Sequence, residues 1–206
     1  MNILSPELPE LPEAVAVLRR KLPAGGEVAQ DYVFEGVLAD GSTGSVRLSG
    51  LFAPGKNTLI VYNFMFGPKM KRACPSCASI LDSLDGSAPH VSQRVNLVVV
   101  AKSPLPRILE FARERGWRRL RLLSSAGNAY NRDYFGETAE GAQMPMLNVF
   151  VKDRGKIRHF WGSELLYAPW ARGQEPRHVD SIWPIWNLFD VTPEGRGTDW
   201  HPQLAY

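Results

Sequence analysis

The two cysteines of this 206-residue chain stand in one short motif, Cys74-Pro75-Ser76-Cys77, directly ahead of a helical pattern. A continuous apolar run over residues 58–66 precedes the motif and predicts a buried strand. Proline is favoured in the first turn of a helix, so Pro75 predicts a helix that begins beside Cys74. The chain must therefore fold with a strand, a loop, two close sulfur atoms and a helix in that order.

The position of the motif predicts different roles for its two cysteines. Free N–H groups and a partial positive charge at the start of a helix favour the thiolate form of Cys74. We therefore expect Cys74 to be the nucleophile, while Cys77, one turn further on and more buried, resolves a mixed disulfide. Pro75 and Ser76 are expected to support the site by forming the helix start.

Positive charge gathers just before the motif. No acidic residue occurs over residues 41–81, and Lys71 and Arg72 lie close to Cys74 in the sequence. Cations near a sulfur favour its thiolate, so we expect Lys71 and Arg72 to support Cys74 electrostatically. The alternative is a solvated basic loop, because surface charges are strongly screened.

Composition excludes several other classes of protein. With 44% hydrophobic and 22% charged residues, the chain has the composition of an ordinary globular domain. The net charge of +3 does not predict a nucleic-acid partner, and no nucleotide-binding motif occurs. The apolar runs are too short to span a membrane, and the N-terminus does not resemble a secretory signal. We therefore expect a cytoplasmic protein without a membrane partner.

Helix and strand patterns alternate along the chain. Predicted helices cover residues 10–22, the segment after Cys74, 105–115, 128–135 and 181–191; predicted strands cover residues 32–38, 45–48, 58–66, 95–101, 120–124, 145–152 and 156–162. This order predicts an α/β fold with a central mixed sheet flanked by helices. A strand followed by CxxC and a helix is the layout of a thioredoxin-like redox site, so the predicted fold is thioredoxin-like.

We expect one domain over residues 1–206. Residues 1–50 would form an N-terminal extension made of a helix and a hairpin. Residues 51–191 would form the thioredoxin-like core, and residues 192–206 a C-terminal tail.

Several segments resemble one bacterial family, catalogued as domain of unknown function 899, thioredoxin-like and described as predicted dithiol-disulfide oxidoreductases. They are residues 32–36, 59–68, 74–77 and 190–196. The resemblance covers most of the chain and implies thiol–disulfide exchange at the cysteine pair. The implied partner is a protein or small-molecule thiol or disulfide. The redox-active disulfide would serve in place of a cofactor, with no metal.

A proline opposite the cysteine pair follows from the same analogy. Thioredoxin-type sites carry a cis proline there, which exposes the preceding backbone to an extended substrate. Pro145, which follows Met144 and precedes a predicted strand, matches that place. We therefore expect a cis Met144–Pro145 bond and a substrate-positioning role for both residues.

A wider resemblance, to peroxiredoxins, covers residues 122–125, 134–136 and 149–158. Peroxiredoxins carry a Pro, a Thr and the peroxidatic Cys at spacings of four and then three. Counting back from Cys74 gives Lys71 and Gly67, and counting back from Cys77 gives Cys74 and Met70. The missing Thr argues against a thiol peroxidase, which is the alternative enzyme. The buried Asp of thioredoxin is also missing, since the strand offers only Asn63.

Two further interpretations remain open. The cysteines could bind zinc or a partner in a non-catalytic protein, in which case zinc would need ligands from among His90, His159, His178 and His201. Five of the six tryptophans follow residue 160, namely Trp161, Trp170, Trp183, Trp186 and Trp200. Core filling is their commoner role, and a substrate cleft or the interface of a homo-oligomer is the alternative.

Overall fold

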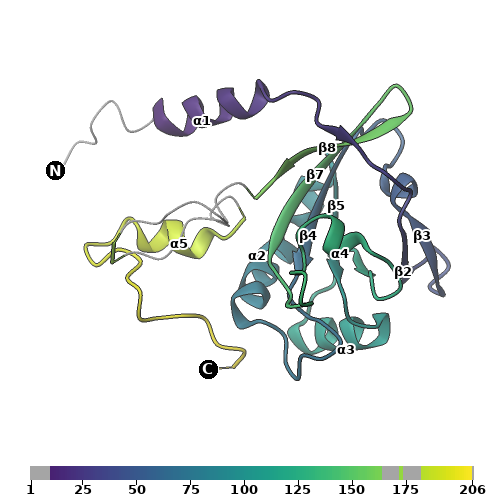
Figure 1. The fold of residues 1–206 in the computed structure, drawn as a ribbon. Helices are drawn as coiled ribbons and strands as arrows, with labels where there is room; N and C mark the ends of the chain where they lie inside the picture. The colour runs from purple at the N-terminus through teal and green to yellow at the C-terminus, as the bar shows by residue number, and fades with distance from the viewer. Residues whose placement is uncertain (1–9, 164–171, 174–181, 206) are drawn as a thin grey trace.

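The computed structural model describes residues 10–163, 172–173 and 182–205 (Figure 1). Its strands are β1 (Gly26–Glu27), β2 (Val33–Val37), β3 (Thr43–Arg47), β4 (Thr58–Phe64), β5 (Asn96–Ala101), β6 (Leu122–Ser124), β7 (Met146–Asp153) and β8 (Lys156–Gly162). Its helices are α1 (Glu10–Arg20), α2 (Pro75–Val91), α3 (Leu105–Arg115), α4 (Tyr130–Asp133), α5 (Pro184–Phe189) and a 3-10 turn, η1 (Leu48–Leu51). The predicted α/β class with a central mixed sheet is confirmed.

The strands form one eight-stranded sheet in the order β1-β8-β7-β4-β5-β6-β2-β3. At its centre β4 pairs in parallel with β5 and antiparallel with β7. All six residues of β5 are buried, as its unbroken apolar sequence predicts for a parallel strand covered on both faces. β5 also pairs in parallel with β6, so the carboxyl ends of β4, β5 and β6 lie at the same end of the sheet.

The sheet separates two apolar clusters. On one face Tyr62 and Phe64 of β4 pack with the buried stripe of α2, with α3, and with Trp183 just before α5 and Trp186 within it. On the other face Val61 and its neighbours pack with an aromatic group from β2, α4 and β7. Strand residues alternate between the faces, so the side chain of Tyr62 points toward α2.

The N-terminal segment contributes strands to both edges of the sheet. β1 pairs with β8, and β2 pairs with β6 while forming the predicted hairpin with β3. Alternate residues of β2 are buried, which explains why the hairpin joins the sheet. The helix expected over residues 181–191 is shorter, because α5 spans Pro184–Phe189, and Ser181 lies outside the described residues.

The longest helix of the described chain, α2, has 17 residues. No helix in that part of the chain combines the length and apolar character that a membrane span requires.

Candidate active site

The cysteine motif begins α2 in the predicted way. The backbone N–H of Cys74 donates to the Met65 carbonyl at 3.2 Å, which brings the motif back to the end of β4. Cys74 is the N-cap of α2, with φ −65° and ψ 123°, and Pro75 is the first helical residue. The Cys77 N–H points at the Cys74 sulfur, 3.5 Å away. The sulfur therefore occupies the position of a capping acceptor.

The pKa of the Cys74 thiol is lowered to about 6. The largest cause is a hydrogen bond from the Cys77 thiol, which stabilises the Cys74 thiolate. Partial burial opposes it, and the backbone N–H groups of Cys77 and Ser76 and the charge of His201 lower the pKa further. Ser76 thus supports the site through its backbone, and His201 is a contribution that the sequence did not predict.

The pKa of the Cys77 thiol is shifted in the opposite direction. Its exposed fraction is 1%, and burial, followed by its hydrogen bond and charge interaction with Cys74, raises its pKa well above that of an ordinary thiol. The Tyr62 hydroxyl and the Met65 backbone act in the other direction. Both cysteines are free, so the structure contains the dithiol form, and a redox-active disulfide stays a prediction.

The predicted electrostatic role of Lys71 and Arg72 stays a prediction. Both are exposed, and they line a pocket of 380 Å³ together with Arg107 of α3. A charged side chain that contributes to the lowered pKa of Cys74, as the smallest of its causes, is His201 of the C-terminal tail. The Arg115 side chain donates to the Leu204 carbonyl at 2.6 Å and so ties this tail to α3. Because residues 74 and 201 are far apart in the sequence, no sequence pattern predicts that His201 acts on Cys74.

The prediction of a cis Met144–Pro145 bond is wrong. No cis peptide bond occurs within the described residues, and the bond is trans, the lower-energy form. The Met144 N–H donates to the Gly136 carbonyl at 2.9 Å, and β7 then runs antiparallel to β4 directly after Pro145. No turn intervenes that would need the cis form.

The position of Met144 and Pro145 relative to the cysteine motif agrees better with the prediction than the geometry of the peptide bond between them does. Asn63 of β4 pairs with Met146 of β7, so the same register carried two residues further brings Met144 level with Met65. Met65 is the residue whose carbonyl binds Cys74. A Cβ atom at Gly67 would also lie only 2.8 Å from the Gln143 side chain, so the two loops touch.

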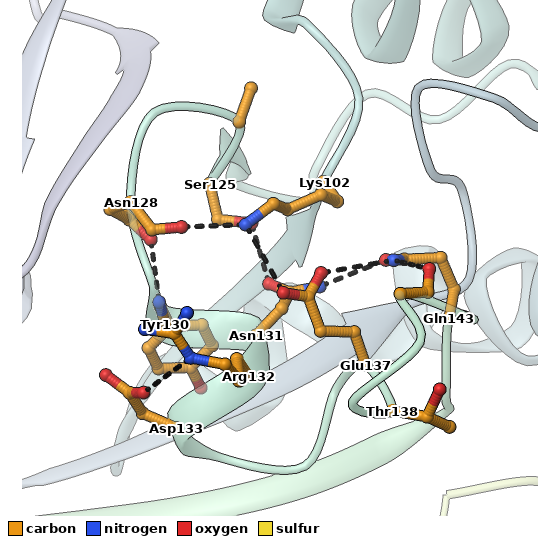
Figure 2. A network of polar contacts seen from close by, with 12 residues as sticks. Lys102, Ser125, Asn128, Tyr130, Asn131, Arg132, Asp133, Glu137, Thr138 and Gln143 are labelled. Atoms are coloured by element: carbon orange, nitrogen blue, oxygen red, sulfur yellow. Dashed lines mark hydrogen bonds and ion pairs between the residues drawn. The ribbon is translucent and has the colours of Figure 1, made fainter.

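A polar network fixes the loop that leads to Met144, as Figure 2 shows. Lys102, just after β5, donates to the Asn128 carbonyl at 2.7 Å and pairs with the Glu137 carboxylate at 3.6 Å. The Gln143 side chain contacts Glu137 at 3.4 Å and accepts from Asn131 at 3.2 Å. Lys102 and Glu137 have exposed side-chain fractions of only 18% and 15%, so solvent screens their ion pair weakly.

The other candidate residues have structural surroundings. The His159 ring contacts the Asn148 side-chain oxygen at 2.8 Å, and burial lowers its pKa, which fits a satisfied core histidine. No group of three or more His, Cys, Asp or Glu side chains in the described part of the chain could hold a metal ion. Trp183 and Trp186 are buried in the core, whereas Trp170 and His178 lie outside the described residues.

Two residues that pack against α2 or fix it in place escaped the sequence prediction. Tyr62 faces Cys77. The sequence could have predicted this contact, because strand alternation places Tyr62, and the apolar stripe of α2 places Cys77, at the same interface. Asp85 of α2 is 6% exposed and accepts three backbone N–H groups, from residues 118, 119 and 120, at 2.7–3.1 Å. It fixes α2 against the loop before β6, which no local pattern reveals.

The mixed sheet and the helix that begins at the cysteine pair define a thioredoxin-like, peroxiredoxin-like fold. Plasmodium yoelii thioredoxin peroxidase I is similar, with 19% identity and a TM-score of 0.50, over 88% of this chain and 100% of that chain. A mutant of Xylella fastidiosa PrxQ gives 11% identity and a TM-score of 0.52, over 81% and 96%. Reduced Prx3 of Vibrio vulnificus with hydrogen peroxide gives 10% and 0.50, over 73% and 92%. At these identities the likeness shows the fold alone.

The chain belongs to a family of bacterial proteins of unknown function (DUF899), whose model matches residues 6–206. This match confirms the family resemblance that the sequence segments indicated. No curated protein matches the chain.

Proposed function

We propose that the protein is a thiol–disulfide oxidoreductase that uses Cys74 and Cys77. The observation that carries the proposal is the opposite ionisation of two adjacent thiols. Cys74 has a pKa of about 6 and is largely a thiolate at neutral pH, whereas burial keeps Cys77 protonated before the mixed disulfide forms. Dithiol exchange requires this division between an attacking thiolate and a resolving thiol.

The proposed reaction has two steps. The Cys74 thiolate attacks one sulfur of a substrate disulfide R–S–S–R′, forming the Cys74–S–S–R bond and releasing R′–S⁻. Cys77 then loses its proton, and its sulfur attacks the Cys74 sulfur. The Cys74–Cys77 disulfide forms, R–S⁻ leaves, and the proton of Cys77 has passed to solvent. The substrate gains two electrons, and the cysteine pair supplies them without a further cofactor.

The substrate is proposed to be a protein or small-molecule disulfide that enters between the loop after β4 and the segment before β7. The Met144 N–H already donates to Gly136, so the Met144 carbonyl is the group proposed to pair with the substrate backbone. Pro145 would hold this carbonyl in place through its fixed φ angle. A reducing compartment such as the cytoplasm would maintain the dithiol form.

The test is the reduction of a chromogenic aromatic disulfide by wild type, Cys74→Ser and Cys77→Ser. We expect Cys74→Ser to lose the reaction, because Cys77 is buried and protonated. We expect Cys77→Ser to release one equivalent of thiolate and to stop as a mixed disulfide, visible by mass spectrometry. Circular dichroism controls for folding. Undiminished reduction by Cys74→Ser would refute the assignment.

A thiol peroxidase is the second candidate, favoured by the acidic Cys74 and by the fold shared with thioredoxin peroxidase I. Against it, Lys71 and Gly67 occupy the places where peroxiredoxins carry Thr and Pro. Rapid, Cys74-dependent peroxide consumption would select this candidate, and slow consumption beside fast disulfide reduction would exclude it.

A further inference from the structure

Tyr62 is a buried tyrosine at the centre of the proposed redox site. It lies on β4, between strands β5 and β7, and its exposed fraction is 0%. Its side chain belongs to the same packed cluster as Cys77. Bulk water therefore does not reach the contact between the aromatic ring and the resolving cysteine.

The hydroxyl of Tyr62 makes no hydrogen bond of ordinary geometry in the dithiol form. It is one of three buried side-chain polar atoms in the described residues that have no such partner. The hydroxyl nevertheless faces the Cys77 sulfur closely enough for each group to alter the ionisation of the other. A buried hydroxyl without a partner is costly, so its position beside a reacting sulfur calls for a functional reason.

We propose that the Tyr62 hydroxyl donates a hydrogen bond to the Cys77 thiolate when Cys77 attacks the mixed disulfide. This inference rests on the proposed function, since it describes the second step of that exchange. A neutral donor stabilises a thiolate without adding a negative charge beside it.

Tyr62 acts as a donor and not as a base. Burial, followed by the charge of the neighbouring Cys77, raises the pKa of the Tyr62 phenol well above its ordinary value, so the phenol keeps its proton. The proton of Cys77 is lost to solvent before the attack, and the substrate leaves as the thiolate R–S⁻. The bond that breaks is Cys74–S–S–R, and the bond that forms is Cys74–Cys77.

The timing of the hydrogen bond follows from the charges around Cys77. The groups that shift its ionisation are Cys74 at the N-cap of α2, Tyr62 on β4 and the uncharged Met65 backbone, while His201 of the tail acts on Cys74. Formation of the mixed disulfide removes the negative charge of Cys74. The pKa of Cys77 then falls, and the Tyr62 hydroxyl gains a thiolate to which it can donate.

The test compares Tyr62→Phe with the matched control Tyr130→Phe. Both tyrosines are 0% exposed, and both substitutions remove one hydroxyl, but Tyr130 lies in the cluster on the other face of the sheet, 3.5 Å from the Asn63 oxygen. Stopped-flow measurements with a chromogenic aromatic disulfide follow two thiolate releases, one for attack by Cys74 and one for resolution by Cys77, between pH 5 and 10.

We expect Tyr62→Phe to leave the first release unchanged and to move the pH midpoint of the second release upward by about one unit. A tenfold loss of Cys77 thiolate is partly offset by the greater nucleophilicity of a more basic thiolate. With a Brønsted coefficient of about 0.5, the second release then slows about threefold for each unit of pKa. Tyr130→Phe is expected to keep the wild-type midpoint.

An unchanged midpoint in Tyr62→Phe would overturn the inference, and so would equal shifts in both variants, which would indicate a packing effect. These results are distinct from failure of the proposed function. If Cys74→Ser still reduces the disulfide, the proposed function is wrong. If Cys74→Ser is inactive and Tyr62→Phe resolves like wild type, only the role of Tyr62 is wrong.

Discussion

Replacing Cys77 by Ala or by Ser tests how the structure produces an acidic Cys74. The hydrogen bond from the Cys77 thiol is the largest cause of the lowered pKa of Cys74, ahead of the backbone N–H groups at the helix start. Ala removes this donor and Ser replaces it with a hydroxyl donor. Both keep the backbone N–H of residue 77, which lies 3.5 Å from the Cys74 sulfur in the wild type. The two variants therefore differ in the side-chain donor and not in the helix start.

The size of the effect follows from the strength of such a bond. A hydrogen bond to a charged group contributes about 1.5–3 kcal/mol, and one pKa unit corresponds to about 1.36 kcal/mol. Cys74 is only partly buried, so solvent weakens the bond and the lower end of that range applies. We expect Cys77→Ala to raise the pKa of Cys74 from about 6 by about one unit, and Cys77→Ser to stay near the wild-type value.

Alkylation by iodoacetamide as a function of pH measures this pKa, because the thiolate alone reacts. In both variants Cys74 is the single thiol, and mass spectrometry confirms that one group is added. In the wild type, Cys77 is 1% exposed and is expected to be protected. Equal midpoints in Cys77→Ala and the wild type would refute the reasoning, since the N–H groups and His201 would then suffice to explain the acidic thiol.

Two predictions concern the scaffold around the site. Asp85→Ala removes the acceptor for the backbone N–H groups of residues 118–120. We therefore expect the free energy of unfolding, measured by urea titration, to fall by about 3 kcal/mol. Asp40→Ala, at an exposed turn residue, is the control. Lys102→Met leaves the Glu137 carboxylate without its cation, so we expect a loss of about 2 kcal/mol and increased hydrogen exchange in the loop before Met144. Wild-type stability in either variant would contradict the corresponding contact.

The order of helices and strands was largely predictable, because periodicity is a local property of the sequence. The buried strands β4 and β5, the stripe of α2 and the hairpin of β2 and β3 all follow from the spacing of apolar residues and turn residues. The position of that hairpin in the sheet was harder to predict. Its pairing with β6 depends on contacts between residues distant in the sequence, such as Glu35 with Ser124.

The site was predictable where one helix start determines it. Pro75 and the position of the cysteines were enough to predict which thiol is acidic. The source of the acidity was only partly predictable, because the charge from His201 depends on how the tail returns to α3 through the contact of Arg115 with Leu204. The supporting role of the basic residues nearest in sequence, Lys71 and Arg72, stays a prediction.

The arrangement of the cysteine pair also determines the order of events in the proposed exchange. A buried thiol whose pKa is raised by a neighbouring thiolate attacks poorly while that thiolate persists. Once Cys74 has formed a mixed disulfide, the neighbouring charge is gone, and Tyr62 and the Met65 backbone remain to stabilise the thiolate of Cys77. The first step thus activates the second, so that Cys77 becomes a nucleophile only when a substrate is attached. A peroxide substrate would start the same sequence through a sulfenic acid at Cys74, which Cys77 could resolve as well. The second release of the disulfide reaction therefore reports on Cys77 and Tyr62, and only the first step, at Cys74, distinguishes the two candidate functions.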